Sequence, residues 1–345
     1  MTGEDFKENI DDSNFDEKEI DNDDLSWLKD FDEDFSNDQV NLDKDFIENV
    51  EEELKLKKNN ELAEMIGIAL GDGSIPKNQN RLRVTLNKSE EPQYTQHVND
   101  LMQKVLNKKP SIYEPKDADA IKLTISSKKL VEDLINNGLK PGDKKVNQVD
   151  VPQWIKQNKD YQKDCLRGLV DTDGSIHVHR ANESIRIGFK NTSEPLMADF
   201  KEMCENNEIK TGKIYPVKGE NTYELHIESK KNVVKFINKI EPKKWGFRAE
   251  TFGLVLKSIS NKNKGRSIKK ELSGIYSDKR VHYNQEYKEH LKQLCEKHGY
   301  DVSRESIIKE ITKALTYNEN WTNLSKEKII KLNEKAKRVI EKLEF

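Results

Sequence analysis

The sequence has few cysteines and no long apolar run, and these shortages exclude several classes of protein. Its three cysteines, Cys165, Cys204 and Cys295, match no zinc motif and no disulfide framework, so we expect them to be reduced and packed in the interior. No apolar run is long enough to cross a bilayer, and acidic residues follow Met1 where a signal peptide would be basic and then apolar. We therefore expect a cytoplasmic protein with no membrane partner.

Charge is distributed unevenly along the chain. The formal net charge is only −3, but residues 1–53 hold 22 Asp and Glu against 4 Lys, a net charge of −18. The other 292 residues therefore carry +15, of which residues 271–345 contribute +2. A basic central region attracts phosphate backbones and releases counterions when it binds them, which favours a nucleic-acid partner. When charge is the only evidence, a solvated surface that binds no partner explains the basic region equally well.

One phrase occurs twice in the central region. Met65–Ile75 reads MIGIALGDGSI and Leu166–Ile176 reads LRGLVDTDGSI, with Asp72 and Asp173 separated by 101 positions. Each copy is an apolar helix that ends in one acidic residue and Gly and then turns into a strand. A single Asp-Gly at a helix end is usually just a turn, because Gly supplies the positive φ there. The matched second copy instead indicates a duplicated unit.

Small residues give each of these helices a face that admits another backbone at close range. They recur at helical spacing, and we predict that four of them form the helix interface: Gly67, Gly71, Gly168 and Thr172. Asp72 and Asp173 would then project from the same edge of the helix pair and repel each other unless a cation lies between them. Hard oxygen ligands favour Mg²⁺ (or Mn²⁺), so we predict a metal site at Asp72 and Asp173 that includes Gly71 and Thr172.

Polar side chains alternate with apolar ones in several predicted strands. The polar faces hold the candidate DNA-binding residues Arg81, Arg83, Thr85, Asn87, Lys122, Thr124, His177, His179, Arg186 and Lys190, and Ser184 and Gly188 fall in the same register. An antiparallel sheet with such a face can lie in the major groove and read base edges. For any one strand, an ordinary solvated face is the simpler interpretation.

Each repeat has the order helix, hairpin, helix, hairpin, helix, which predicts an α+β fold. We expect helices over residues 93–106, 128–136, 195–206 and 230–240, and strands over 111–113, 120–126, 212–217 and 222–228. The domain boundaries that follow are 1–53 for an acidic, disordered tail, 54–155 for the first repeat, 156–258 for the second, and 259–345 for a helical C-terminal extension. In that extension we expect helices over 287–297, 303–315 and 325–343. Packing helices are favoured there over a helix-turn-helix unit.

The doubled phrase resembles the LAGLIDADG motif of homing endonucleases, and the resemblance covers about residues 54–258. Gly67 and Gly168 match the first glycine of the motif, and Asp72 and Asp173 match its final acidic residue, which in that family binds the catalytic metals. Leu70 stands where the family often has another Asp, whereas the second copy keeps Asp171. The resemblance implies a single-chain, two-repeat member, expected to be monomeric, with two pseudo-symmetric αββαββα half-domains that form a DNA-binding saddle.

The activity implied by the resemblance is intron homing by a sequence-specific endonuclease that hydrolyses both strands of double-stranded DNA across a minor groove, with water as the nucleophile. A lysine after the last helix of each repeat approaches the active site in similar enzymes, and we select Lys144 and Lys243 for that catalytic role from the pairs Lys144-Lys145 and Lys243-Lys244. No terminal His-Asn pair precedes a nucleophile, so we expect a free-standing protein and not an intein. Two alternatives stay open: a non-catalytic DNA-binding regulator, and a maturase that binds structured RNA.

Overall fold

The computed structural model describes residues 56–77, 80–179, 184–276, 285–316 and 327. The acidic tail 1–53 and nearly all of the expected helix 325–343 lie outside these residues. No helix in the described part of the chain is long and apolar enough to span a membrane.

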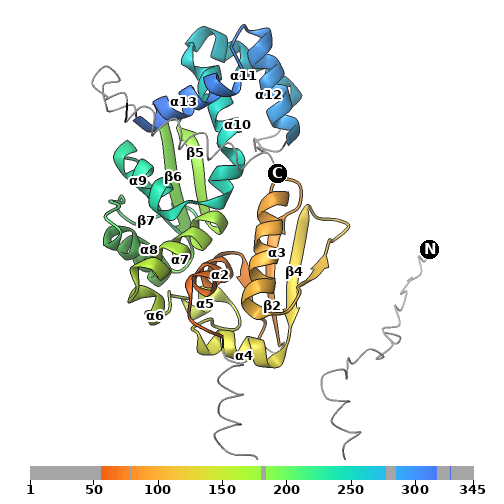
Figure 1. Ribbon diagram of the computed structural model, residues 1–345, viewed down its shortest axis with the longest axis vertical. Helices are drawn as coiled ribbons and strands as arrows, with labels where there is room; N and C mark the ends of the chain where they lie inside the picture. Colours follow the sequence, from red (N-terminus) through yellow and green to blue (C-terminus); the bar gives the residue numbers. More distant parts are fainter. Residues whose placement is uncertain (1–55, 78–79, 180–183, 277–284, 317–326, 328–345) are drawn as a thin grey trace, which may run out of the picture. The chain divides into compact units, whose positions relative to one another are not determined.

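The two repeats have the same order of elements, and Figure 1 draws the first in orange to yellow and the second in green to teal. The first contains α2 (Asn60–Gly71), β1 (Gly73–Ser74), β2 (Arg81–Asn87), α3 (Pro92–Leu106), β3 (Ser111–Tyr113), β4 (Ala120–Ser126) and α4 (Lys128–Asn136). The second contains α7 (Lys159–Thr172), β5 (Gly174–His179), β6 (Ser184–Asn191), α8 (Glu194–Asn206), β7 (Tyr215–Pro216), β8 (Tyr223–Ile227) and α9 (Lys230–Ile240). The antiparallel sheets have the equivalent orders β1-β2-β4-β3 and β5-β6-β8-β7. The predicted α+β class with two αββαββα half-domains is confirmed.

Side-chain caps fix where several of these helices begin. The Asn59 side chain accepts from the amide of Leu62 at the start of α2, and Asn158 accepts from the first amides of α7. Ser127 caps α4 in the same way. Because these caps satisfy amides that lack an intrahelical partner, they set the first turn of each helix.

The strands of the first sheet alternate as the sequence predicts. Leu82, Val84 and Leu86 are buried, while the residues between them are partly or fully exposed. The second sheet departs from the expected pattern at two positions of β6, because Ser184 and Gly188 are buried although they share the register of the polar face. Ser184 pairs with His179 across the strands, and Gly188 lies between Ser175 and His226, whose side chains cover it.

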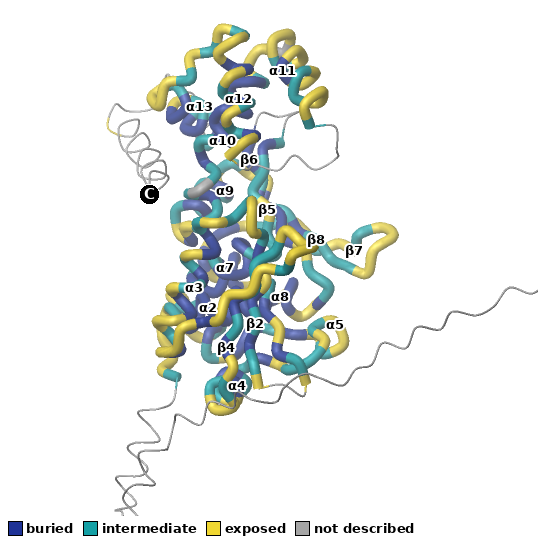
Figure 2. The backbone as a smooth tube through the Cα atoms, turned by 90° about the vertical axis from the view of Figure 1, so that its right-hand side faces the viewer, coloured by how far each residue is buried: buried dark blue, intermediate teal, exposed yellow. Residues whose placement is uncertain are grey.

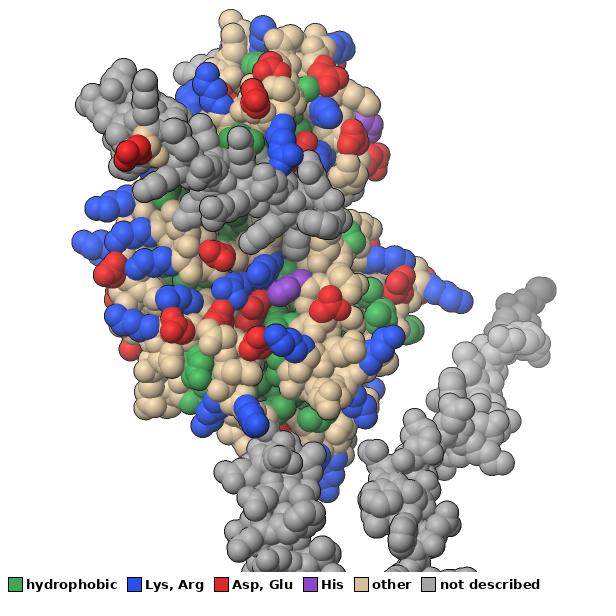
Figure 3. Space-filling view, viewed as in Figure 1, with side chains coloured by type: hydrophobic (Ala, Val, Ile, Leu, Met, Phe, Trp, Pro, Cys, Tyr) green, Lys and Arg blue, Asp and Glu red, His purple; other side chains and the backbone are tan. Residues whose placement is uncertain are grey.

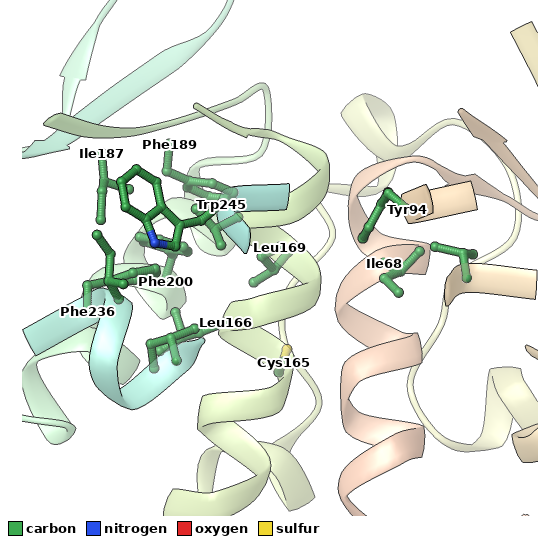
Figure 4. Packing of buried hydrophobic residues seen from close by; sticks show 14 of the residues in the cluster. Ile68, Tyr94, Cys165, Leu166, Leu169, Ile187, Phe189, Phe200, Phe236 and Trp245 are labelled. Carbon is green, nitrogen blue, oxygen red and sulfur yellow. The ribbon is translucent and has the colours of Figure 1, made fainter. Parts of the chain in front are cut away.

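Helices α2 and α7 pack side by side, and this contact joins the two repeats (Figures 1 and 4). A Cβ at Gly67 would lie 2.4 Å from the carbonyl oxygen of Cys165, and one at Gly168 would lie 2.4 Å from that of Glu64. Gly71 lies directly against the Thr172 side chain. The four residues selected from the sequence for the helix interface therefore all lie in it, and only small residues leave room for the contact.

A buried ionic network ties the same helix pair together away from the Asp-Gly ends. Glu64 of α2 accepts from Arg167 of α7 at 2.8 Å and contacts His97 of α3 at 2.7 Å. Arg167 also pairs with Asp164 at 2.5 Å and donates to the Ile240 carbonyl oxygen at the end of α9. Because each of these charges has a partner, the network fixes the relative positions of four helices.

Each repeat is followed by helices that the sequence interpretation did not include. Short helices α5 (Lys144–Asn147) and α6 (Gln153–Lys156) follow the first repeat, and α10 (Lys243–Ser260) and α11 (Lys262–Ile275) follow the second. The expected boundary between residues 258 and 259 falls inside α10. This helix packs against α11, α12 (Gln285–Lys297) and α13 (Arg304–Thr316), and the inward faces of the group are buried (Figure 2).

Gly168→Ala tests the close approach of the two central helices. The added Cβ would also lie 2.7 Å from the backbone nitrogen of Ile68, so α2 and α7 must move apart. We expect the free energy of unfolding to fall by about 1–3 kcal/mol, as for other overpacked sites. The measurement is urea unfolding followed by circular dichroism. The control is Gly274→Ala in α11, where a Cβ meets nothing within 4 Å and where we expect a neutral or slightly stabilising effect.

Candidate active site at the ends of the two central helices

Asp72 and Asp173 occupy equivalent positions at the ends of α2 and α7. The Asp72 amide donates to the Ile68 carbonyl oxygen at 2.9 Å, and the Asp173 amide donates to that of Leu169 at 3.0 Å. The backbone carbonyl oxygens of the two acids then accept hydrogen bonds from strand residues. The amide of Thr85 donates to Asp72, and the amide of Lys190 donates to Asp173. Because Gly71 and Thr172 are in contact, the two acids leave the helix pair at the same end.

The Asp72 residue is half-buried, and its carboxylate has no hydrogen-bond or ion-pair partner among the described residues. Burial raises its pKa from 3.8 to about 6, and the negative charges of Asp173 and Glu91 add to this. The nearby ammonium groups of Lys244 and Lys144 act in the opposite direction. A partly buried carboxylate without a direct partner is suited to bind a cation.

Asp173 has a similar environment but also a direct partner. Burial raises its pKa, while Lys144, a hydrogen bond from Asn191 and Lys244 each favour its ionised form. The Asn191 amide nitrogen lies 2.6 Å from a carboxylate oxygen of Asp173. Asn191 holds this carboxylate in one orientation, a role that sequence reasoning did not assign.

Lys144 brings its ammonium group to the end of α2. Its Nζ donates to the carbonyl oxygens of Leu70, at 2.9 Å, and Gly71. Burial lowers the pKa of Lys144 to about 8, although Asp173 and Asp72 both favour the charged form. Lys144 also lines an open pocket together with Gly71, Thr172, Asp173, Lys190 and Asn191.

The second lysine near the acids is Lys244, whereas the sequence interpretation selected Lys243. Lys244 influences the pKa of both Asp72 and Asp173. Its Nζ lies 2.8 Å from a carboxylate oxygen of Glu91 and 4.8 Å from the ring centre of Tyr94. Lys243 contributes its backbone amide to a different contact, with Asp171, described next.

Asp171 explains why the two copies of the motif differ. Its buried carboxylate accepts from the amides of Lys243, at 2.8 Å, and Lys244, at 3.1 Å, which are the first amides of α10. Burial raises the Asp171 pKa to about 6, although the two hydrogen bonds favour the ionised form and act in the opposite direction. At the equivalent position in the first repeat, Leu70 is apolar, and Asp143 caps the short helix α5 that carries Lys144. The sequence did give a signal for the role of Asp171 in anchoring α10, because an acidic residue within an apolar stretch of a helix needs a buried partner.

The candidate DNA-binding residues lie on the polar faces of the two sheets. In the first sheet Arg81 pairs with Ser126, Arg83 with Thr124, Thr85 with Lys122, and Asn87 with Ala120 across β2 and β4. In the second sheet His177 pairs with Arg186, His179 with Ser184, and Lys190 with Glu224. Two of these residues also contact the acids through the backbone, because the amides of Thr85 and Lys190 donate to the carbonyl oxygens of Asp72 and Asp173.

The donor set at the helix ends fits a magnesium-type ion. Among the described residues, no group of three or more His, Cys, Asp and Glu side chains could hold a metal. Two carboxylates remain, and Mg²⁺ commonly uses one or two of these together with water and substrate phosphate. Asp72 and Asp173 would hold such an ion, and the Asp72 carboxylate, which lacks another partner, carries this fit.

Comparison with known families identifies the second repeat. Residues 160–241 match the family model described as LAGLIDADG-like domain. This part of the chain is similar to a LAGLIDADG-like domain. This domain extends from the first turn of α7 to the residue after α9, so it includes Asp171, Asp173 and the whole second sheet. The match supports the resemblance inferred from the sequence over the second repeat.

Other proteins similar to this chain differ widely in length. The replication factor C small subunit of Methanocaldococcus jannaschii is 28% identical over 196 residues, which are 52% of this chain but only 11% of that protein. Among solved structures, I-DmoI in complex with DNA and Mn has a TM-score of 0.39 and 22% identity, covering 52% of this chain and 96% of that one. Full-length DUF199/WhiA from Thermatoga maritima has a TM-score of 0.40 and 15% identity, covering 86% and 94%.

Asp72→Asn tests the free-energy cost of burying the unpaired acid at the end of α2. The folded-state pKa lies above the ordinary value, so the unfolded state loses its proton first and stability falls as pH rises from about 4 to 6. Without metal, we expect Asp72→Asn to raise the free energy of unfolding at pH 8 by about 1–3 kcal/mol and to have little effect at pH 4. Urea unfolding at both pH values measures this. The exposed Asp100→Asn is the control, and an equal effect of Asp72→Asn at both pH values would contradict the account.

Asp171→Leu gives the second repeat the leucine that the first repeat has at the equivalent position, Leu70. The amides of Lys243 and Lys244 lose their acceptor, so we expect their hydrogen exchange to accelerate at least about tenfold, as for the loss of about 1–2 kcal/mol of local stability. The middle of α10 should keep its protection. The control is Asp160→Leu, which changes an exposed acid on α7, the helix that carries Asp171. It should alter neither the exchange at Lys243 and Lys244 nor the protection of the middle of α10. Unchanged exchange at Lys243 and Lys244 would show that Asp171 does not anchor α10.

Proposed function

We propose that the protein is a metal-dependent endonuclease that hydrolyses phosphodiester bonds of double-stranded DNA. The observation that carries this proposal is the pairing of two equivalent acids, Asp72 and Asp173, at one end of the helix pair, with Lys144 and Lys244 beside them. Neither acid is neutralised by a direct ion pair with a described residue. Such a centre has negative ligands for a divalent ion and positive charge for a phosphate.

In this proposal each group has a separate role. Asp72 and Asp173 would hold Mg²⁺ or Mn²⁺, and an ion bound there would supply Lewis-acid polarisation of a phosphodiester and would favour ionisation of the water that acts as nucleophile. Lys144 and Lys244 offset charge that develops on the phosphate. Asn191 orients Asp173, and Glu91 and Asp171 position Lys244 through its ammonium group and its backbone amide. The polar faces of both sheets bind the duplex.

Lys144 also supports a second candidate, a DNA-binding regulator without catalysis. Its ammonium group already lies on the carbonyl oxygens at the end of α2 and interacts with both acids. A built-in cation of this kind offsets the charge of the acids without a metal. In that case the helix ends would have only a structural role while the sheets still bind DNA.

Cleavage of a randomised plasmid library separates the two candidates. We expect Mg²⁺-dependent cutting by the wild type, and a decrease of at least about a thousandfold for Asp72→Asn and for Asp173→Asn, equivalent to about 4 kcal/mol of transition-state stabilisation. Both variants should still bind DNA. Asp100→Asn, a matched change of an exposed acid, should cut normally. Wild-type binding without cutting would reject the endonuclease and favour the regulator.

A further inference from the structure

The polar faces of the two sheets carry different kinds of positive charge. The first sheet presents Arg81, Arg83 and Lys122, which stay charged at every physiological pH. The second sheet presents three histidines, His177 and His179 on β5 and His226 on β8. His226 was not among the residues selected from the sequence, and the pairing of β8 with β6 places it on this face.

The fixed cations of the second sheet are already neutralised by carboxylates. Arg186 lies 3.0 Å from Glu228, and Lys190 lies 2.5 Å from Glu220. In contrast, no described carboxylate forms an ion pair with Arg81, Arg83 or Lys122 in the first sheet. The positive charge that the second sheet offers to a polyanion therefore depends on its histidines.

The histidines form one cluster on the sheet surface. His177 pairs across the strands with Arg186, and one row away His226 pairs with Gly188. A Cβ at Gly188 would lie 3.2 Å from Nδ1 of His226, so the imidazole ring lies directly over this glycine. The Nδ1 atoms of His226 and His179 are buried without a hydrogen-bond partner among the described residues.

The charged groups that face these rings come from the three strands of the cluster. Arg186 on β6, His226 and Glu224 on β8, and His179 on β5 all act on His177. Glu224 lies 3.4 Å from Nε2 of His226, whose ring centre is 5.8 Å from that of Tyr215 on β7. Burial lowers the pKa of His177, and its cationic neighbours act in the same direction. A phosphate placed on this face would favour protonation instead.

We propose that the two sheets bind the two halves of a DNA site by different chemistry, the first through permanent charge and the second through the His177, His179 and His226 cluster. This inference rests on the proposed DNA binding but not on catalysis. Protonation of the cluster adds cations that contact phosphates and release counterions. Binding of the second half-site therefore tightens as pH falls from 8 to 6, while binding of the first does not change.

The test measures binding of the full chain to a mixed-sequence 24-base-pair duplex by fluorescence anisotropy at pH 6 and pH 8. The chain carries Asp72→Asn and Asp173→Asn, which remove the two candidate metal ligands so that the duplex is not cut during the measurement. We expect affinity at pH 6 to exceed that at pH 8 by about tenfold, the effect of one to two added phosphate contacts. The slope of log affinity against log salt should be steeper at pH 6 by about 1–2.

Three further variants assign the pH effect to the cluster. His177→Gln with His226→Gln should reduce the tenfold difference to less than about threefold, whereas His298→Gln on the turn after α12 should leave it intact. Arg83→Gln in the first sheet should weaken binding by the same factor at both pH values. Circular dichroism checks that each variant folds.

Two outcomes would contradict the inference and can be told apart. Failure of the protein to bind the duplex at either pH would reject the proposed DNA-binding function itself. Binding that is equal at both pH values, or a pH effect that survives the double histidine substitution, would reject only the histidine-dependent half-site.

Discussion

The close contact between α2 and α7 is the constraint on which the rest of the structure depends. Gly67 and Gly168 let the two backbones approach, and Gly71 receives the Thr172 side chain at the end of the pair. That approach brings Asp72 and Asp173 to the same end of the helix pair. A larger side chain at either glycine would separate the acids as well as the helices, so assembly and the candidate chemistry share one cause.

The segment that follows each repeat also packs against the other repeat and holds the two together. After the first repeat, the Val151 amide and the Lys156 ammonium group both contact Asp199 of α8, in the second repeat. After the second repeat, Lys244 and Arg248 of α10 both contact Glu91, at the start of α3 in the first. Each half therefore holds an equivalent helix of the other. The two lysines near the acids come from these segments, so their positions depend on contacts between the repeats.

Local patterns in the sequence predicted the fold more fully than the site. The strands 111–113 and 120–126 and the helices 128–136 and 230–240 have the predicted bounds, because apolar periodicity and caps act within a few residues. Local patterns could not show that Lys244, and not Lys243, is the second lysine near the acids. Lys243 and Lys244 are adjacent in the sequence, and the contact that holds the Lys244 side chain is its ion pair with Glu91 of the other repeat. The burial of Gly188 likewise depends on His226, 38 positions away.

A divalent ion shared by the two acids is the central claim, and X-ray diffraction from crystals grown with Mn²⁺ tests it most directly. Manganese scatters anomalously and accepts the same oxygen ligands as magnesium. The account predicts an anomalous peak at the ends of α2 and α7, within about 2.3 Å of a carboxylate oxygen from both Asp72 and Asp173. A map without a peak there, with the Lys144 ammonium group still on the carbonyl oxygens of Leu70 and Gly71, would contradict it.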